Sequence, residues 1–211
     1  MIRQVLAVMA ALLPSPALAG VQAVSDRGFV SRHLLDAPGS SEEIWETLIV
    51  PAKWWNKAHT YSGDSKNLTI DARPGGCFCE ILPSTISPNA APRGGVEHMR
   101  VVYVERGRAL RMNGALGPLQ ADAVIGSMTI MLKPTDSGTR ILVEYVVGGY
   151  FRTEPNALAS SVDKVLAEQV LGLANKLGGK LVTTSEPAPK EPVEPPKVPL
   201  KGDRIGEIIG R

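Results

Sequence analysis

The spacing of apolar residues divides the chain into a region of strands and one long helix that follows it. From residue 67 to residue 148, apolar and polar positions alternate in short runs, which is typical of half-buried strands. From residue 155 the apolar steps become three and four, which predicts an amphipathic helix over 155–177. Pro155 suits its first position, and Gly178-Gly179 supplies a stop. The apolar stripe consists of Leu158, Val162, Val165, Leu166, Val170, Leu173 and Leu177.

The rest of the fold follows from the same alternation. The breaks between runs are rich in Gly, Pro, Asn and Asp, so consecutive strands should be antiparallel neighbours. A capping box of Ser40 and Glu43 predicts a short helix over 42–49, and a second helical turn is expected over 53–57. The class is therefore α+β. The seven expected strands are 28–37, 67–72, 77–82, 96–105, 109–113, 123–133 and 140–148.

Both ends of the chain differ in composition from the part between them. Residues 1–19 have a basic start, an apolar run and an Ala-Leu-Ala cleavage pattern, which predicts a signal peptide and an exported, periplasmic protein. An uncleaved anchor or a buried helix is the alternative. Residues 20–182 form one expected domain. Residues 183–211 are rich in Pro, Lys and Glu, which predicts a disordered tail whose last residues could alternatively dock on a partner.

Charge restricts the kinds of partner. The formal net charge is +2, and removal of residues 1–19 takes away only Arg3, which leaves +1. No basic stripe is present, so we expect no nucleic-acid partner. No second apolar run is long enough to cross a bilayer, so we expect no stable membrane insertion after cleavage.

Two polar groups of residues are candidates for chemistry. His59, Tyr61 and Asp64 follow a tryptophan pair, and a His with a carboxylate could transfer protons, although local backbone hydrogen bonds are the expected role. On the strand over 96–105, Glu97 points opposite to His98. If Glu97 faces the interior, its pKa should rise, and if it faces water, it only adds solubility.

Cys77 and Cys79 lie two positions apart on one strand, so both thiols face the same way. Their Cα atoms should be about 7 Å apart, the outer limit for a disulfide. Buried thiols are the expected state, with a strained disulfide or metal ligation as alternatives. Because no standard ligand spacing is present, we expect no metal, and no motif implies a cofactor.

Six segments carry a family resemblance: 51–64, 67–68, 74–80, 96–104, 114–120 and 147–150. They resemble bacterial members of the START/Bet v 1-like superfamily, also called SRPBCC proteins. The resemblance covers residues 29–178. Within this group the chain is similar to exported polyketide cyclase-like and Hsp90-activator-like domain proteins. The resemblance implies a helix-grip fold, in which a curved seven-stranded sheet wraps around the C-terminal helix and leaves a cavity.

The resemblance implies a function as well as a fold. The leading hypothesis is a binder of a small hydrophobic ligand such as a lipid, a polyketide or an aromatic molecule. The alternative is a cyclase- or hydratase-like enzyme that uses His59, Glu97 or His98 for proton transfer. The residues expected to contact the ligand are Trp55, His59, Tyr61, Cys79, Glu97, Met99, Tyr103, Met112, Met128, Ile130, Val143, Tyr145, Val162 and Leu166.

Overall fold

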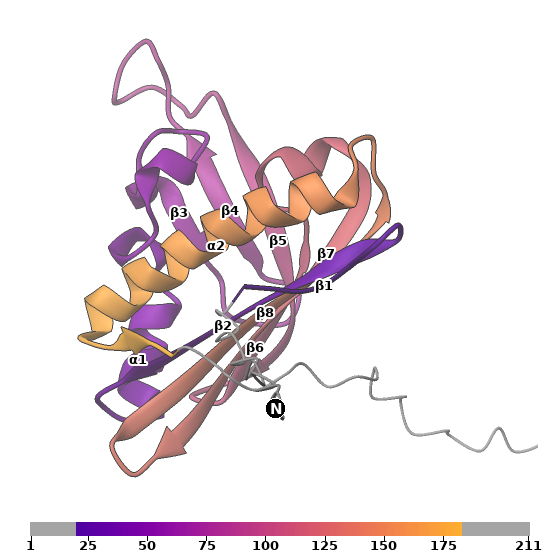
Figure 1. Cartoon of the computed structure of the whole chain (residues 1–211). Coiled ribbons are helices and arrows are strands. Elements are labelled where there is room, and N and C mark those ends of the chain that lie inside the picture. Colours follow the sequence, from indigo (N-terminus) through magenta and orange to yellow (C-terminus); the bar gives the residue numbers. More distant parts are fainter. Residues whose placement is uncertain (1–19, 183–211) are drawn as a thin grey trace, which may run out of the picture.

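The computed structural model describes residues 20–182, which form a large antiparallel sheet and a long helix close to the end of the described chain (Figure 1). The strand order is β1-β2-β8-β7-β6-β5-β4-β3. Strand β9 pairs with Leu35 and Asp36 of β2, past the part of β2 that pairs with β1. The strands are β1 (Gly20–Ser25), β2 (Gly28–Ala37), β3 (Leu68–Ile70), β4 (Cys77–Leu82), β5 (Gly94–Glu105), β6 (Ala109–Gly114), β7 (Ala123–Thr135), β8 (Gly138–Tyr150) and β9 (Lys180–Leu181).

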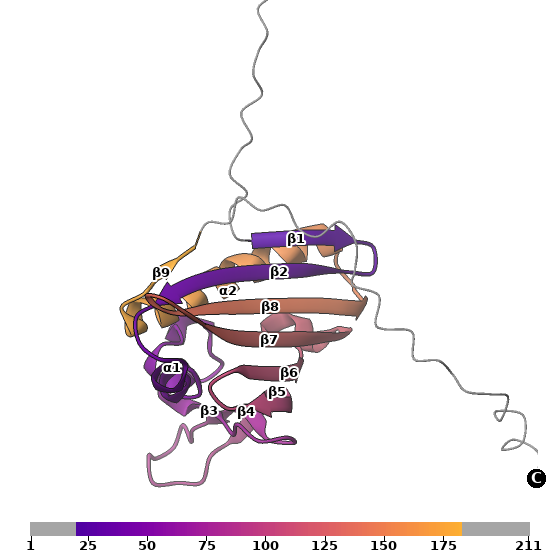
Figure 2. The same ribbon diagram turned by 90° about the horizontal axis from the view of Figure 1, so that it is seen from below.

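Two α-helices and four short 3-10 helices complete the described chain. Helix α1 follows β2, and helix α2 lies across one face of the sheet (Figures 1 and 2). The protein is therefore α+β. The helices are α1 (Ser41–Leu48), η1 (Pro51–Lys53), η2 (Lys57–His59), η3 (Ser65–Asn67), η4 (Gly117–Ala121) and α2 (Pro155–Leu177).

Helix α2 begins and ends where local chemistry predicts. Pro155 occupies the first turn, where a missing N–H costs nothing. Gly178 ends the helix with a φ of 67°, and its N–H is donated to the carbonyls of Ala174 and Asn175. The expected bounds of this helix are confirmed.

The core lies between α2 and the inner face of the sheet. Alternate residues of β2, β6, β7 and β8 are buried there, and α1 adds Ile44, Trp45 and Leu48. Buried residues on the sheet side include Phe29, Leu35, Phe78, Met99, Val101, Leu110, Met112, Met128, Ile130, Leu132, Ile141, Val143, Tyr145 and Val147.

The structure corrects the number of strands from seven to nine. Strand β1 extends the sheet before the first expected strand, and β9 is a two-residue strand after α2. A strand of two residues has no readable period, because alternation needs several positions. The helical turn expected over 53–57 is also wrong: 3-10 turns flank it at Pro51–Lys53 and Lys57–His59.

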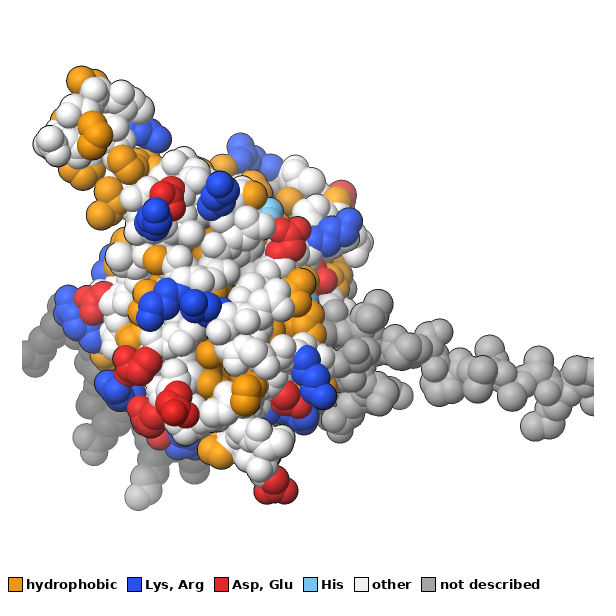
Figure 3. Space-filling view, turned by 90° about the vertical axis from the view of Figure 1, so that its left-hand side faces the viewer, with side chains coloured by type: hydrophobic (Ala, Val, Ile, Leu, Met, Phe, Trp, Pro, Cys, Tyr) orange, Lys and Arg blue, Asp and Glu red, His pale blue; other side chains and the backbone are white. Residues whose placement is uncertain are grey.

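The loop between β4 and β5 projects from the body, and Figure 3 shows apolar side chains gathered at its tip. Ile86 in this loop is 92% exposed. The loop is held by local bonds such as Ala90 N to Ser87 O at 3.1 Å, and Arg93 N donates to Leu82 O at 2.9 Å where the loop returns to the sheet.

The expected signal peptide and Pro-rich tail lie outside the described residues. Within residues 20–182, neither α-helix combines the length and the apolar character that a membrane span requires.

Candidate functional site

A pocket of about 500 Å³ opens between the N-terminal half of α2, the segment around η2 and the start of η4. Helix α2 gives it one wall of residues spaced by three and four, which the amphipathic stripe predicts. Most of the lining is apolar. The residues of the wall are Trp55, Ala58, His59, Thr60, Tyr61, His98, Leu116, Gly117, Pro118, Leu158, Ser161, Val162, Val165 and Leu166.

Hydrogen bonds attach the segment before η2 to helix α2. The N–H of Asn56 donates to Gln169 Oε1 at 2.8 Å, and Gln169 is itself buried. Helix α2 also approaches the backbone of Trp54 closely, because a Cβ added at Gly172 would lie 2.4 Å from Trp54 O. The indole of Trp55 donates to His59 O at 3.1 Å and packs against Phe78, with ring centroids 5.3 Å apart. These contacts fix one side of the pocket.

A β-bulge in β5 turns His98 toward the interior. Phe78 of β4 pairs with Met99, and Cys79 pairs with Glu97, so His98 is an extra residue between them. A bulge places two successive residues on one face, and both His98 and Met99 are buried. Glu97 is consequently left on the outer face, where it pairs with Arg100.

Glu80 is the buried partner of His98. Its carboxylate is fully buried and accepts hydrogen bonds from the N–H groups of Tyr61, at 3.1 Å, and Ser62. His98 Nε2 lies 3.0 Å from Glu80 Oε2. Burial raises the pKa of the Glu80 carboxyl, but the hydrogen bonds from Ser62, Tyr61 and His98 outweigh it and hold the pKa below its usual value. Glu80 is therefore an ionised acceptor.

The contact with Glu80 determines the state of the His98 ring. A carboxylate can only accept, so Nε2 carries a proton and donates it. Burial lowers the pKa of His98, and Glu80 offsets this only in part, so the ring is neutral at neutral pH. Nδ1 is then an acceptor, and it is buried without a hydrogen-bond partner among the described residues. His98 is also one of the residues that line the pocket, so the side chain that carries this unpaired acceptor is part of the pocket wall.

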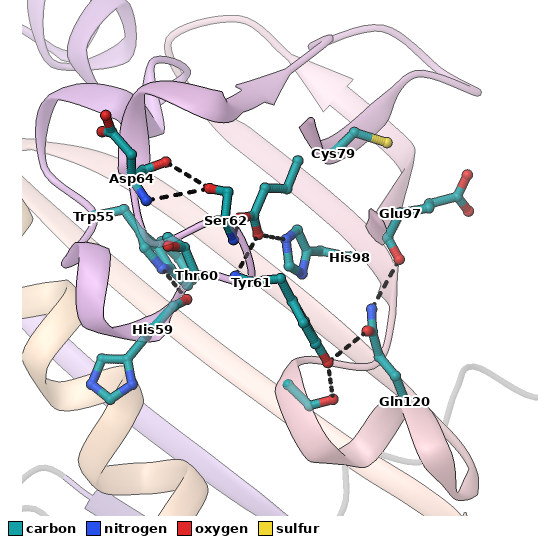
Figure 4. Close-up of polar contacts among 12 residues, drawn as sticks. Trp55, His59, Thr60, Tyr61, Ser62, Asp64, Cys79, Glu97, His98 and Gln120 are labelled. Atoms are coloured by element: carbon teal, nitrogen blue, oxygen red, sulfur yellow. Dashed lines mark hydrogen bonds and ion pairs between the residues drawn. The ribbon is translucent and has the colours of Figure 1, made fainter. Parts of the chain in front are cut away.

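Polar residues also surround the pocket on its exposed side. His59 Nε2 lies 2.8 Å from Glu168 Oε2 of α2. The Tyr61 hydroxyl donates to Gly117 O at 3.1 Å (Figure 4). Asp64 caps η3 by accepting from Lys66 N at 3.0 Å, which is the local backbone role expected for it. His59 instead joins η2 to α2 through its side chain, so the backbone hydrogen bond expected for that side chain is not the contact observed.

The pocket wall contains six of the candidates named from the sequence: Trp55, His59, Tyr61, His98, Val162 and Leu166. Their contact with a ligand stays a prediction. Six others are buried in the core without lining this pocket: Met99, Met112, Met128, Ile130, Val143 and Tyr145.

Three further candidates lie on the outer side of the sheet. Figure 4 shows the Cys79 sulfur and the Glu97 carboxylate directed away from the His98 ring. Tyr103 is 45% exposed because a second bulge, between Val101 and Tyr103, ends the alternation on which its inward placement depended. None of the three lines the pocket.

The two cysteines form a disulfide, which corrects the expectation of buried thiols. Their Cα atoms are 5.3 Å apart, closer than an extended strand allows, so the strand is locally bent. Glu97 lies near both sulfurs, but the sulfurs are bonded to each other.

Sequence reasoning missed Glu80 and a second polar cluster beneath α2. Glu80 shares the inward face of β4 with Phe78, so period-two alternation was sufficient to find it. The second cluster is Ser31, His33 and Asp163: the Ser31 hydroxyl and His33 Nε2 both contact Asp163 Oδ1, at 2.6 and 3.1 Å. It joins β2 to α2 and does not line the pocket.

Comparison with known proteins gives similarity of structure at low sequence identity. MLL2253 from Mesorhizobium loti is 18% identical with a TM-score of 0.47, covering 71% of this chain and 96% of its own. DynU16, from the dynemicin biosynthetic locus, is 16% identical with a TM-score of 0.48, covering 74% of this chain and 48% of its own. The Aha1 dimer from Colwellia psychrerythraea is 14% identical with a TM-score of 0.46, covering 70% and 95%.

No protein-family model matches the sequence, and no curated protein matches it. The class of the protein is thus defined by its architecture, an antiparallel sheet with a long helix across one face and a pocket beside that helix.

Proposed function

We propose that this protein is an exported, periplasmic binder of a small hydrophobic molecule, held in the pocket beside α2. The observation that carries the proposal is the lining: α2 presents Leu158, Val162, Val165 and Leu166 to a space of about 500 Å³. Burial of apolar ligand surface there would supply roughly 25 cal/mol per Å². The few polar groups in the wall would set the orientation of the ligand.

A helix-grip fold of the START/Bet v 1-like kind supports this proposal. The element order of strand, short helices, strands and long helix agrees with that fold. The two additional strands, β1 and β9, both extend the β2 edge of the sheet and leave the pocket residues in place. Lipids, polyketides and aromatic molecules are the ligand classes that the resemblance implies.

Proton transfer on a bound molecule is a second candidate function, and the Glu80–His98 pair favours it. A neutral imidazole that is oriented by a carboxylate is the usual arrangement of a general base. Among the three catalytic candidates, only His98 combines burial, a fixed ring orientation and a place in the pocket wall. Conversion of a bound molecule by the wild type but not by His98→Phe would distinguish catalysis from binding.

Two adjacent serines of α2 provide a test of the binding proposal. Ser161 lines the pocket and Ser160 does not, although both are exposed. Titration with the neutral fluorophore N-phenyl-1-naphthylamine should give saturable binding to the wild type and to Ser160→Trp. Ser161→Trp should bind at least roughly tenfold more weakly, because the indole occupies the pocket opening.

The control is the matched position on the same helix. Circular dichroism and the unfolding midpoint should be similar for the two variants, which separates a blocked pocket from a damaged fold. Absence of saturable binding to the wild type, or equal affinity of both tryptophan variants, would contradict the proposal.

A further inference from the structure

We infer that the ligand carries a neutral hydrogen-bond donor, such as a phenol, an enol or an alcohol, and places it on Nδ1 of His98. This inference rests on the proposed function and adds the chemical class of the molecule. It follows from the way Glu80 fixes the imidazole, from the burial of Nδ1 and from the place of His98 in the pocket wall.

The first step is the direction of the hydrogen bond. Glu80 already accepts from two backbone N–H groups, those of Tyr61 and Ser62, so its carboxylate is held in place from one side. The bond to His98 Nε2 then fixes both the rotation of the ring and its tautomer. A ring fixed in this way offers Nδ1 as an acceptor and cannot donate from it.

The second step is the surroundings of the ring. Phe78 packs against the imidazole with centroids 5.1 Å apart, and the Tyr61 ring lies 6.0 Å away. The Tyr61 hydroxyl is directed elsewhere, to Gly117 and Gln120, and does not reach Nδ1. Within residues 20–182, no hydrogen-bonding group satisfies the atom, although buried nitrogen acceptors are normally paired.

The third step excludes charged ligand groups at this position. A ligand carboxylate would bring a second acceptor to Nδ1, close to the negative charge of Glu80. An ammonium group would have to leave water for a wall made largely of apolar side chains. A neutral hydroxyl meets neither penalty and donates one hydrogen bond, so hydroxylated aromatic or polyketide-like molecules fit best.

Two ligands of the same skeleton test the inference. 2-Naphthol has a phenolic donor, and 2-methoxynaphthalene keeps the oxygen but has no proton to donate. Isothermal titration of each ligand into the wild type should show 2-naphthol binding roughly tenfold more tightly, as one buried hydrogen bond allows. In His98→Phe, which keeps an aromatic ring, this preference should disappear.

The comparison separates this inference from the proposed function. If both ligands bind and their affinity ratio is the same in the wild type and in His98→Phe, the donor inference is wrong while the pocket still binds apolar molecules. If neither ligand binds the wild type although N-phenyl-1-naphthylamine does, the donor inference is wrong and the binding proposal stands. If none of the three binds, both are wrong.

His98→Phe leaves Glu80 without one partner, so a measurement on the wild type is also needed. The ¹⁵N signals of the imidazole report which ring nitrogen is protonated. Addition of 2-naphthol should shift the unprotonated Nδ1 signal of His98, and 2-methoxynaphthalene should shift it much less. An unprotonated signal that belongs to Nε2 instead, or equal shifts with both ligands, would overturn the inference.

Discussion

At the scale of single residues, Glu80 holds the polar side of the pocket together. Its side chain is fully buried and joins two parts of the chain that are far apart in the sequence: the backbone N–H groups of Tyr61 and Ser62, and the ring of His98. A buried carboxylate is tolerated only when it is paired in this way. Its removal should therefore cost more than the removal of a surface carboxylate.

Replacement of Glu80 by Ala should lower the free energy of unfolding by about 3 kcal/mol, since it leaves buried donors without an acceptor. Glu97→Ala on the next strand is the matched control, because that side chain is exposed and pairs with Arg100 at the surface. Its effect should be under about 0.5 kcal/mol. Urea unfolding of both variants measures the difference, and equal effects would contradict the role given to Glu80.

The sequence could predict part of this site but not its orientation. His98 was a candidate from its residue type, yet alternation alone left the facing of Glu97 open. The bulge between Glu97 and Met99 decides it, and no Gly or other local signal marks its position in the sequence. The second bulge, which leaves Tyr103 exposed, also has no local signal in the sequence that would predict it.

At the scale of elements, the contact between α2 and the segment around Trp54 shapes the pocket. Gly172 is the only glycine inside α2 between Pro155 and Leu177, and it lets the helix approach Trp54 O. On the same helix, the side chain of Gln169 accepts a hydrogen bond from the backbone N–H of Asn56. The position of η2, and with it His59, depends on this close approach.

An alanine at Gly172 should therefore destabilise the protein by about 1–3 kcal/mol, because its Cβ would overlap a backbone oxygen. Without that overlap, Gly→Ala inside a helix should raise the free energy of unfolding by roughly 0.5–1 kcal/mol. The sign of the change therefore distinguishes close packing at Gly172 from an ordinary helical position. Thermal and urea unfolding measure it. Asn175→Ala, at an exposed position of the same helix, should be neutral or slightly stabilising, and a stabilising Gly172→Ala would refute the close packing.

Elements with strong local signals could be predicted from the sequence, and elements defined by distant contacts could not. The bounds of α2 follow from Pro155, the apolar stripe and Gly178, all of which act locally. Strand β9 exists because Lys180 and Leu181 meet β2 far away in the sequence. The disulfide likewise depends on a local bend of β4 that an extended strand does not imply.

At the scale of the whole molecule, periodicity specifies which faces are buried but not whether they fill the space between them. The same apolar stripe of α2 contributes Val170 and Leu173 to the core and Leu158 and Val165 to the pocket wall. The division depends on where the sheet, η2 and η4 stand relative to the helix. The pocket was therefore an expectation from resemblance, and its geometry needed the structure.

The central claim is that this pocket holds an apolar molecule, and native mass spectrometry of protein isolated from its own cells tests it most directly. The account predicts a species heavier than the polypeptide alone, whose extra mass is lost on denaturation and is absent from Ser161→Trp but retained by Ser160→Trp. Repeated recovery of only the bare polypeptide from the wild type, or the same extra mass in Ser161→Trp, would contradict it.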